Sequence, residues 1–354
     1  MKTLLEKYNT WVDTLTVFDE ERIFIWLGPA GIGDKISCLP AFKHLKKINP
    51  NKKIVLYVEP LNIDLWKCCR YIDAVIPEGY VKGDGALNIR PIDIGRKAFW
   101  SFFEHHQKHI SKSNIEQICD VEYTDDIPLE YEISTYDYDL PKIDEYKSEL
   151  IEKSKGKKIV AISPAYTMYS RMWSIKSWKR LTDLLQKNGY FVVALGGQND
   201  LEIKNVDLDM CGEYPFRIIP KLLDLFHSVV TLNSGMLHLA SVNQDVKIVY
   251  VSVGQFPPEL IAPYRRGKLF HNMEVIDHNC NLKQTCFEGH ISEKLLRPTM
   301  YNFLDHYKHE TGADYPEDKI ELMKKYCCWH YCAKVLNKYS CSDLITPEEV
   351  MERI

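Results

Sequence analysis

The sequence predicts an α/β protein in which helices cover parallel sheets in two successive halves of the chain. Three observations predict it. Short apolar segments alternate with amphipathic stretches in both halves. A glycine-rich turn at residues 28–33 joins the first clear apolar segment to a helical pattern. The same alternation restarts near residue 158, after an acidic connection at residues 116–152.

In the first half, a short amphipathic lead precedes a β-α-β-α-β pattern. We expect parallel strands at residues 22–27, 53–59 and 73–76, and helical stretches at residues 34–48 and 63–71. In the second half, we expect strands at residues 158–163, 190–195, 228–232 and 246–253, and helices at residues 175–188 and 220–226. The predicted domains are therefore two Rossmann-like units, residues 1–140 and 155–277, followed by a helical, cysteine-rich tail at residues 278–354.

Composition restricts the class of protein. A chain of 354 residues that is 45% hydrophobic and 27% charged fits two globular domains and excludes a disordered, collagen-like or coiled-coil protein. Its apolar runs are too short to span a bilayer, and its N-terminus turns polar too soon for a secretory signal. We therefore expect a cytoplasmic protein without a transmembrane segment. The net charge of −4 indicates no general nucleic-acid binder.

Charge is distributed unevenly along the chain. Residues 116–152 contain 13 acidic residues and two lysines, which is typical of a solvated connection. A basic cluster occurs earlier in the chain. It would suit the phosphates of a lipid or of DNA, but an ordinary solvated helix face explains it equally. The cluster consists of Lys43, Lys46, Lys47, Lys52 and Lys53.

The glycine turn admits a dinucleotide-binding interpretation. Gly28, Gly31 and Gly33 lie between a strand and a helix, as a phosphate-binding turn requires, and Glu59 ends the next strand. The spacing nevertheless departs from G-x-G-x-x-G. The Tyr-x-x-x-Lys candidate at residues 138–142 contains a proline that would disturb a helical turn. An NAD(P)-dependent oxidoreductase is therefore the weaker alternative.

Five motifs occur in a fixed order along the chain. They are Gly33-Asp34-x-x-x-x-Leu39-Pro40-Ala41, Ser163-Pro164-Ala165 followed by Arg171-Met-Trp173, the strand and glycine pair of residues 190–197, Asn233-Ser-Gly-Met-Leu-His-Leu-Ala240, and Cys341-Ser-Asp-Leu-Ile-Thr-Pro-Glu-Glu-Val350. Their content and order resemble the heptosyltransferase-like family of glycosyltransferases, glycosyltransferase family 9. Residues 80–155 have no counterpart in this comparison.

The resemblance implies a GT-B fold, in which two Rossmann-like domains face a cleft. The first domain would bind the acceptor and the second the nucleotide-sugar donor. Transfer to a hydroxyl would invert the anomeric carbon without a divalent ion. Asp34 would be the general base, although a carboxylate at this position can also cap the following helix. Trp173 is expected to pack the helix that follows it.

The resemblance also implies a set of donor-binding residues: Gly31, Gly33, Arg171, Asn233, Ser234, Gly235 and His238. Backbone N–H groups at a helix start and cations would stabilise the leaving diphosphate. Two residues depart from the family pattern, since Arg171 replaces a lysine and Asn233 replaces an acid. A capped helix and a surface cation are the alternative interpretations. Asp200 or Glu202 would accept a hydrogen bond from the ribose.

The substrates are less specified. By analogy the donor is an ADP-heptose-like nucleotide sugar. The acceptor hydroxyl would belong to a glycolipid, to a protein, or to a hydroxymethylated DNA base as in a phage-type enzyme. A non-catalytic GT-B binding subunit is a further alternative, favoured by Asn233. The sequence gives no indication of the oligomeric state.

The eleven cysteines fall into two groups. Cys38, Cys68, Cys69, Cys119 and Cys211 lie among apolar residues and are expected to be buried thiols. The tail holds the others, of which Cys280, Cys286, Cys332 and Cys341 would form a four-thiolate site for a structural zinc or iron. This tail resembles the iron-bound cysteine finger of one branch of the family. Packed free thiols remain the alternative.

Overall fold

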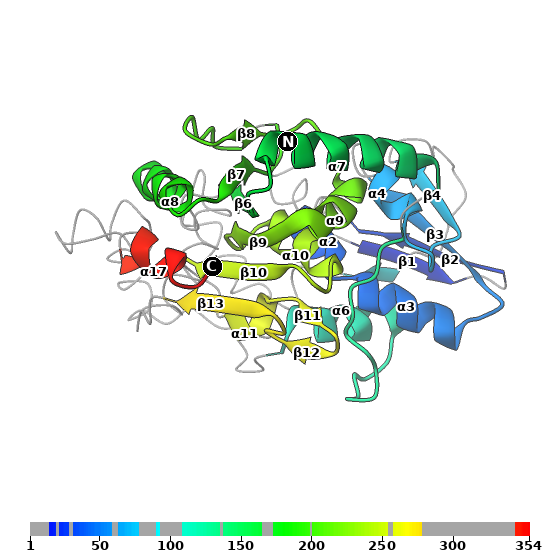
Figure 1. Cartoon of the computed structure of the whole chain (residues 1–354). Coiled ribbons are helices and arrows are strands. Elements are labelled where there is room, and N and C mark those ends of the chain that lie inside the picture. The colour runs from blue at the N-terminus through cyan, green and yellow to red at the C-terminus, as the bar shows by residue number, and fades with distance from the viewer. Residues whose placement is uncertain are drawn as a thin grey trace, which may run out of the picture.

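A computed structural model describes residues 14–18, 21–27, 31–58, 63–77, 90–92, 108–134, 137–164, 173–198, 200–253, 258–277 and 344–354. These residues form two sheets with helices against them (Figure 1). One sheet uses strands from the first 92 residues, and the other uses strands from residues 159–277.

The first sheet has the strand order β4-β3-β2-β1-β5. Its strands are β1 (Thr14–Phe18), β2 (Arg22–Trp26), β3 (Lys53–Val58), β4 (Ala74–Pro77) and β5 (Arg90–Ile92). The pairs β2–β3 and β3–β4 are parallel, as predicted. Strands β1 and β5 were not predicted from the sequence, and β1 pairs antiparallel with both β2 and β5. Only three residues connect β1 to β2, and so short a connection can join only antiparallel neighbours.

The helix predicted at residues 34–48 is in fact two helices, α2 (Ile32–Ile36) and α3 (Leu39–Ile48). Pro40 lies in the first turn of α3. Because proline has no backbone N–H, it cannot donate to the preceding turn, and the chain starts a new helix there. The separate α2 therefore contains Asp34 in its first turn.

The acidic connection differs from the solvated segment that its composition predicts. It includes the end of α6 (Ile110–Cys119) and most of α7 (Leu140–Ser154), and the side chains of Ile127, Leu129 and Tyr131 between them are buried. Many of its acids neutralise cations elsewhere in the fold. Glu132 pairs with Lys43, and Arg217 Nη2 lies 2.8 Å from Asp139 Oδ1.

The second sheet is entirely parallel, with the strand order β13-β10-β9-β6-β7-β8. Its strands are β6 (Ile159–Ser163), β7 (Phe191–Ala194), β8 (Leu208–Asp209), β9 (Phe226–Thr231), β10 (Lys247–Ser252) and β13 (Met273–Asp277). The central strands are almost wholly buried, as near-continuous apolar runs predict for a covered parallel sheet. The helices of this half are α8 (Ile175–Lys187), α9 (Ile219–Leu222), α10 (Gly235–Val242) and α11 (Pro258–Ile261), and β11 (Tyr264–Arg265) forms a small hairpin with β12 (Lys268–Leu269).

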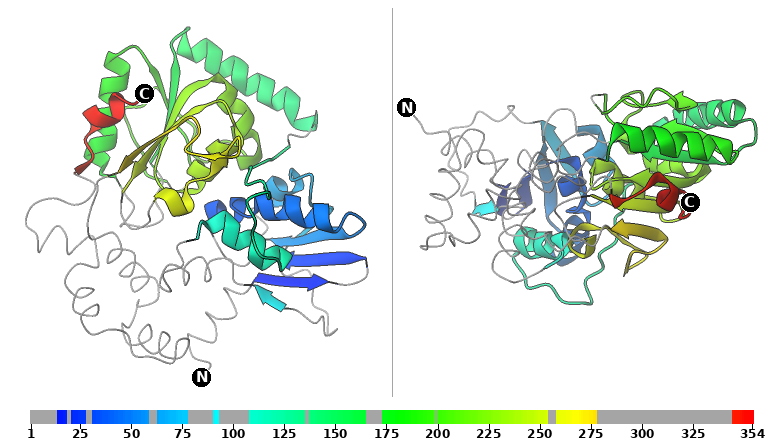
Figure 2. Two further views of the ribbon diagram at one scale, coloured as in Figure 1. Left: turned by 90° about the horizontal axis from the view of Figure 1, so that it is seen from below. Right: turned by 90° about the vertical axis from the view of Figure 1, so that its left-hand side faces the viewer.

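The end of the chain returns to the second sheet. Helix α17 (Pro347–Met351) packs beside α8 (Figure 2). Trp173 is fully buried, and its indole Nε1 donates a 3.0 Å hydrogen bond to the Ile345 carbonyl. The prediction that Trp173 packs the fold is therefore confirmed. The other predicted tail residues, including Cys280, Cys286, Cys332 and Cys341, lie outside the described residues.

Two further expectations concern cysteines and membrane spans. Cys38, Cys68, Cys69 and Cys119 are buried thiols, as predicted, whereas Cys211 is half-buried. In the part of the chain that the structure describes, no helix is long and apolar enough to cross a membrane.

Candidate active site

The second sheet changes direction of winding between β6 and β9. The chain proceeds outward from β6 to β7 and β8, and then returns to β9 on the other side of β6. In open parallel sheets, ligands bind beyond the carboxyl ends of the strands at such a switch point. The loops that follow β6 and β9 are therefore the natural binding elements. The second of these loops contains Asn233 and Ser234 and leads into α10.

Ser234 forms the start of α10. Its Oγ accepts a hydrogen bond from the Met236 amide at 3.2 Å and lies 3.3 Å from Thr231 Oγ1. Ser234 and His238 are both buried, with 8% and 4% of their surfaces exposed. The hydroxyl of Ser234 therefore acts as the helix cap and occupies the Met236 amide, so α10 offers an anion here the Gly235 amide and the positive end of the helix dipole.

Helix α2, which begins with the last two residues of the glycine-rich motif, lies directly against α10 (Figure 1). A Cβ added to Gly235 would lie 2.0 Å from Ile32 Cγ2, and one added to Gly33 would lie 2.7 Å from His238 Cδ2. Neither position has room for a side chain, so glycine is required for the close approach of the two backbones. The structure thus brings Gly33, Gly235 and His238 together across the two halves.

Replacing Gly235 with Ala is expected to lower the free energy of unfolding by about 1–3 kcal/mol, the usual cost of overpacking. The added methyl group would overlap Ile32 Cγ2. The double variant Gly235→Ala/Ile32→Ala should recover most of this loss, since it removes the overlapping group. Urea denaturation of the single and double variants checks both effects. If the losses in free energy of unfolding caused by Gly235→Ala and Ile32→Ala were strictly additive in the double variant, the contact between these residues would be contradicted.

Asp34 occupies the third position of α2 and is exposed to solvent. Its Oδ2 accepts a 3.2 Å hydrogen bond from the Gly31 amide, so the carboxylate caps its own helix. Helix capping is the alternative role that the sequence predicted for Asp34. Because the side chain is exposed and only one oxygen is used in this hydrogen bond, the cap leaves the carboxylate open to a ligand.

A series of buried side chains, linked by hydrogen bonds and one ring stack, connects the two halves of the protein beside this contact. His109 precedes α6, and its Nδ1 accepts a hydrogen bond from the Ser111 amide at 3.1 Å. The ring proton must therefore lie on Nε2, which donates to the Ala262 carbonyl of the second half at 2.9 Å. Tyr131 completes this series, because its hydroxyl lies 2.8 Å from Ser111 Oγ and its ring stacks on His238.

No sequence motif marks His109, Ser111 or Tyr131. All three lie in the stretch where no family motif was found, and histidine is not a usual helix cap. Their importance arises from contacts between residues far apart in the chain, since Ala262 lies 153 positions from His109. The sequence contains no local signal for such a contact.

The buried His109 predicts a pH-dependent stability. Burial lowers the pKa of His109 to about 4, whereas an unfolded histidine has a pKa near 6.5. The neutral, buried imidazole of His109 therefore adds fully to the free energy of unfolding above about pH 6.5. This stabilisation, on the order of 3 kcal/mol, is lost as the pH falls toward 4. Urea denaturation between pH 7 and pH 4.5 should show this loss, and His109→Gln should lack it. If the free energy of unfolding changed equally with pH in the wild type and in His109→Gln, the loss could not be assigned to His109.

Other predicted residues are not gathered at this contact. Arg171 lies outside the described residues. Asp200 instead holds the turn after β7, where its Oδ2 accepts from the Gly197 amide at 2.8 Å. In the basic cluster, Lys43 pairs with Glu132, and Lys46 Nζ lies 2.8 Å from Asp73 Oδ2. Two of its five cations are thus already neutralised within the fold.

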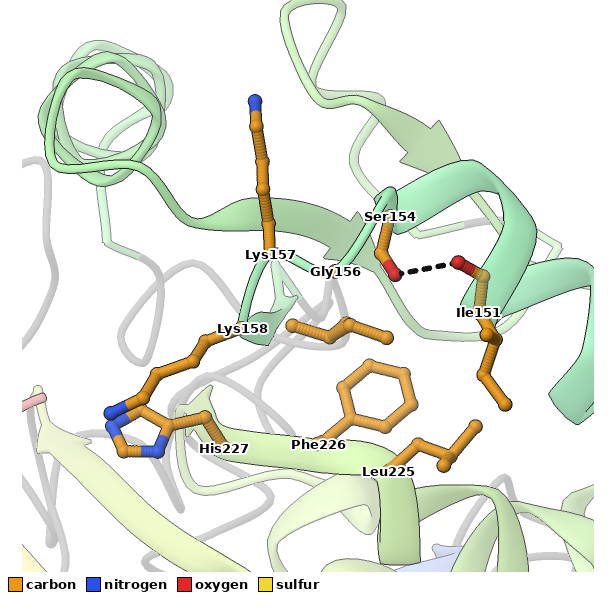
Figure 3. A pocket seen from close by; sticks show the side chains of 9 residues that line it. Ile151, Ser154, Gly156, Lys157, Lys158, Leu225, Phe226 and His227 are labelled. Carbon is orange, nitrogen blue, oxygen red and sulfur yellow. Dashed lines mark hydrogen bonds between the residues drawn. The ribbon is translucent and has the colours of Figure 1, made fainter.

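A separate hollow is lined by Ile151, Lys157, Lys158, Phe226 and His227, among others (Figure 3). It lies where β6 and β9 begin, at the end of the sheet opposite Gly235. Since ligands of such sheets bind at the carboxyl ends of the strands, we do not assign the active site to it. Among the described residues, no group of three or more His, Cys, Asp or Glu side chains could hold a metal ion.

Comparison with known proteins defines the class of this fold and site. Two α/β units of this kind form the GT-B fold, which the chain shares with solved heptosyltransferase-family structures. The chain belongs to glycosyltransferase family 9 (heptosyltransferase), whose family model matches residues 95–290, more than half of its length. The chain is therefore a glycosyltransferase, and the oxidoreductase alternative is wrong. Among curated proteins, none matches this chain.

Solved structures show the same fold at low sequence identity. A family 9 glycosyltransferase from Veillonella parvula DSM 2008 is 14% identical, with a TM-score of 0.60, and the match covers 95% of this chain and 96% of that one. The E. coli ADP-heptose lps heptosyltransferase II is also 14% identical, with a TM-score of 0.53 and coverage of 72% and 90%. The iron-containing dodecameric glycosyltransferase TibC from enterotoxigenic E. coli H10407 is 17% identical, with a TM-score of 0.52 and coverage of 96% and 76%.

Proposed function

We propose that this chain is an inverting glycosyltransferase that moves a heptose-like sugar from an ADP-linked donor to an acceptor hydroxyl. The observation that carries the proposal is the contact between α2 and α10. It supports an assembled site because the helix that contains Asp34 and the helix that follows the Asn233–Ser234 loop touch across the two sheets. The E. coli heptosyltransferase II, whose name includes ADP-heptose, supplies the analogy for the donor.

In this mechanism Asp34 accepts the proton of the acceptor hydroxyl as its oxygen attacks the anomeric carbon. The bond between that carbon and the diphosphate oxygen breaks, and the diphosphate leaves with the electron pair. Attack from the face opposite the leaving group inverts the anomeric centre. Asp34 is exposed and hydrogen-bonded only through Oδ2 in the contacts above, so its carboxylate can reach a bound hydroxyl.

The leaving diphosphate requires stabilisation of its developing charge. The Gly235 amide, the first N–H of α10, is suited to this, since a helix start has a partial positive charge. His238 would add a donor from the same helix, and Arg171 a guanidinium. No divalent ion is needed when these groups carry the charge.

A thermal-shift screen with ADP, UDP, GDP, CMP and NAD tests the donor. At a ligand concentration 100 times the dissociation constant, binding stabilises the folded state by about 2.7 kcal/mol. We expect a clear rise in melting temperature with ADP. A rise with a different nucleotide alone would overturn the proposed donor. The anomeric configuration of the product, measured by NMR, tests inversion.

The acceptor is a glycolipid, a protein or a hydroxymethylated DNA base. A DNA acceptor requires phosphate contacts, and binding must then weaken steeply as salt rises. Lys43 and Lys46 are already paired with acids, so this part of the basic cluster favours an acceptor that is not DNA. Salt titration of binding to DNA and to a glycolipid distinguishes them.

We also propose that the tail cysteines Cys280, Cys286, Cys332 and Cys341 hold a structural zinc or iron in a cytoplasmic protein. Four thiolates suit either metal, and a reducing compartment disfavours disulfides. TibC, which is described as iron-containing, supports the comparison. Metal analysis of the purified protein should give about one equivalent of zinc or iron per chain. Less than about half an equivalent would contradict the proposal.

A further inference from the structure

Helix α2 contains only five residues, Ile32–Ile36. An isolated helix of this length is not stable in water, so its position depends on the contacts at its two ends. Its first residues, Ile32 and Gly33, pack against Gly235 and His238 of α10. The other end is held by a different element, α6.

The end of α2 is held by two consecutive side-chain hydrogen bonds. Ser37 Oγ donates to the Asp34 carbonyl at 2.5 Å, and Asn114 Nδ2 donates to Ser37 Oγ at 2.7 Å. The direction of both bonds is fixed, since the carbonyl can only accept and the Ser37 hydroxyl must then accept from the Asn114 amide. Ser37 and Asn114 have no exposed surface. Hydrogen bonds buried in this way are costly to lose.

Helix α6, which contains Asn114, is itself connected to the second half. His109 at its start donates to the Ala262 carbonyl, and Ser111 contacts Tyr131, whose ring stacks on His238 of α10. Helix α6 is therefore joined both to the helix of Asp34 and to the helix assigned to the donor. A displacement of Asn114 would therefore change the position of α2, which contains Asp34, relative to α10.

We propose that Asn114 is a positioning residue, which acts through Ser37 to fix Asp34 in relation to α10. The inference rests on the proposed function, in which Asp34 is the general base. Misplacement of a reacting group by about 1 Å costs on the order of 100-fold in rate. Asn114→Ala and Asn114→Leu, of which the second retains most of the side-chain volume, should therefore lower turnover 10- to 100-fold.

Gln117 provides a matched control on the same helix. It is also buried, and its Nε2 donates to Ser113 Oγ within α6 rather than to α2. Gln117→Ala should destabilise the protein by a similar amount and leave turnover within about twofold, since it does not alter a contact with α2. A loss of turnover equal to that of Asn114→Ala would indicate a general weakening of α6 and overturn the proposal.

The position of α2 can be measured without any reaction. Cys38 follows α2, is fully buried, and its Sγ lies 3.5 Å from the Asp34 carbonyl. Labelling with N-ethylmaleimide, read for each cysteine by peptide mass spectrometry, should be at least about tenfold faster at Cys38 in Asn114→Ala, because local opening governs access to buried groups. Cys119 on α6 should stay protected. Unchanged labelling, or equal acceleration at both cysteines, would overturn the proposal.

Turnover is measured as ADP release from ADP-heptose with water as acceptor. The variants at Asn114 should lower kcat with little change in KM, and Asp34→Asn/Asn114→Ala should be no slower than Asp34→Asn, because a misplaced base matters only where the base is present. If Asp34→Asn lowers ADP release and the Asn114 variants do not, the positioning role is wrong. If Asp34→Asn has no effect on ADP release, the proposed function fails. In that case, and also where the wild type does not use water as an acceptor, the labelling of Cys38 still decides whether Asn114 fixes α2.

Discussion

Asp34→Asn is expected to reduce turnover by about 10²- to 10⁴-fold, the usual contribution of a positioned general base. An amide cannot take the proton of the acceptor hydroxyl as the new bond forms. The effect should appear in kcat, because the donor is assigned to α10 and its loop rather than to α2. ADP release and sugar transfer at saturating donor measure it.

Two observations accompany this loss if Asp34 acts as proposed. Affinity for ADP should stay within about twofold, since Asp34 does not contribute to diphosphate binding. The melting temperature should change little, because the asparagine oxygen can still accept from the Gly31 amide. A variant that keeps full turnover would remove Asp34 from the mechanism, and one that also loses ADP affinity would indicate a damaged site.

Arg265→Met is expected to lower the free energy of unfolding by about 3–5 kcal/mol, within the range measured when the partner of buried polar groups is removed. The Arg265 side chain is fully buried. Its guanidinium donates to the carbonyls of Asn243, Val246, His271 and Asn272 at 2.6–3.0 Å. Burial lowers the pKa of Arg265 to about 10, so it remains charged at neutral pH. Its removal would leave these carbonyls without their donor.

The neighbouring Arg266 is the control for this variant. Its side chain is 57% exposed and pairs with Asp245, which is 82% exposed. Ion pairs in such surroundings contribute at most about 1 kcal/mol, so Arg266→Ala should have a small effect. Chemical denaturation of both variants makes the comparison, and equal losses would show that the fold does not depend on the buried guanidinium.

The sequence predicted much of the fold because buried parallel strands have a strong local signal. The apolar runs that became β6, β9 and β10 are almost wholly buried, and the two-sheet arrangement follows from their alternation with helices. The short strands β1 and β5 have a weaker signal. In β5, Pro91 indicates an edge strand at most, and its pairing with β1 depends on residues 76 positions apart.

The candidate site was predictable only where function imposes a local pattern. Gly33, Asp34, Gly235 and His238 belong to motifs, and the structure brings the motif turn and α10 together. Asn114 and the buried chain from His109 to Tyr131 have no such pattern, because their roles depend on tertiary contacts. The acidic composition of that region suggested solvent exposure, but composition does not reveal that its acids neutralise lysines and arginines elsewhere.

The return of the chain end to α8 has a consequence for how the family can vary. Since β13 ends at Asp277 and Ile345 is again hydrogen-bonded to Trp173, the cysteine-rich stretch lies, along the sequence, between two points that are fixed to the second sheet. The entropy of closing a loop rises only with the logarithm of its length. Such a segment can be lengthened, shortened or exchanged at little cost to the catalytic fold. Evolution can therefore alter the cysteine-rich stretch while the transfer chemistry stays the same.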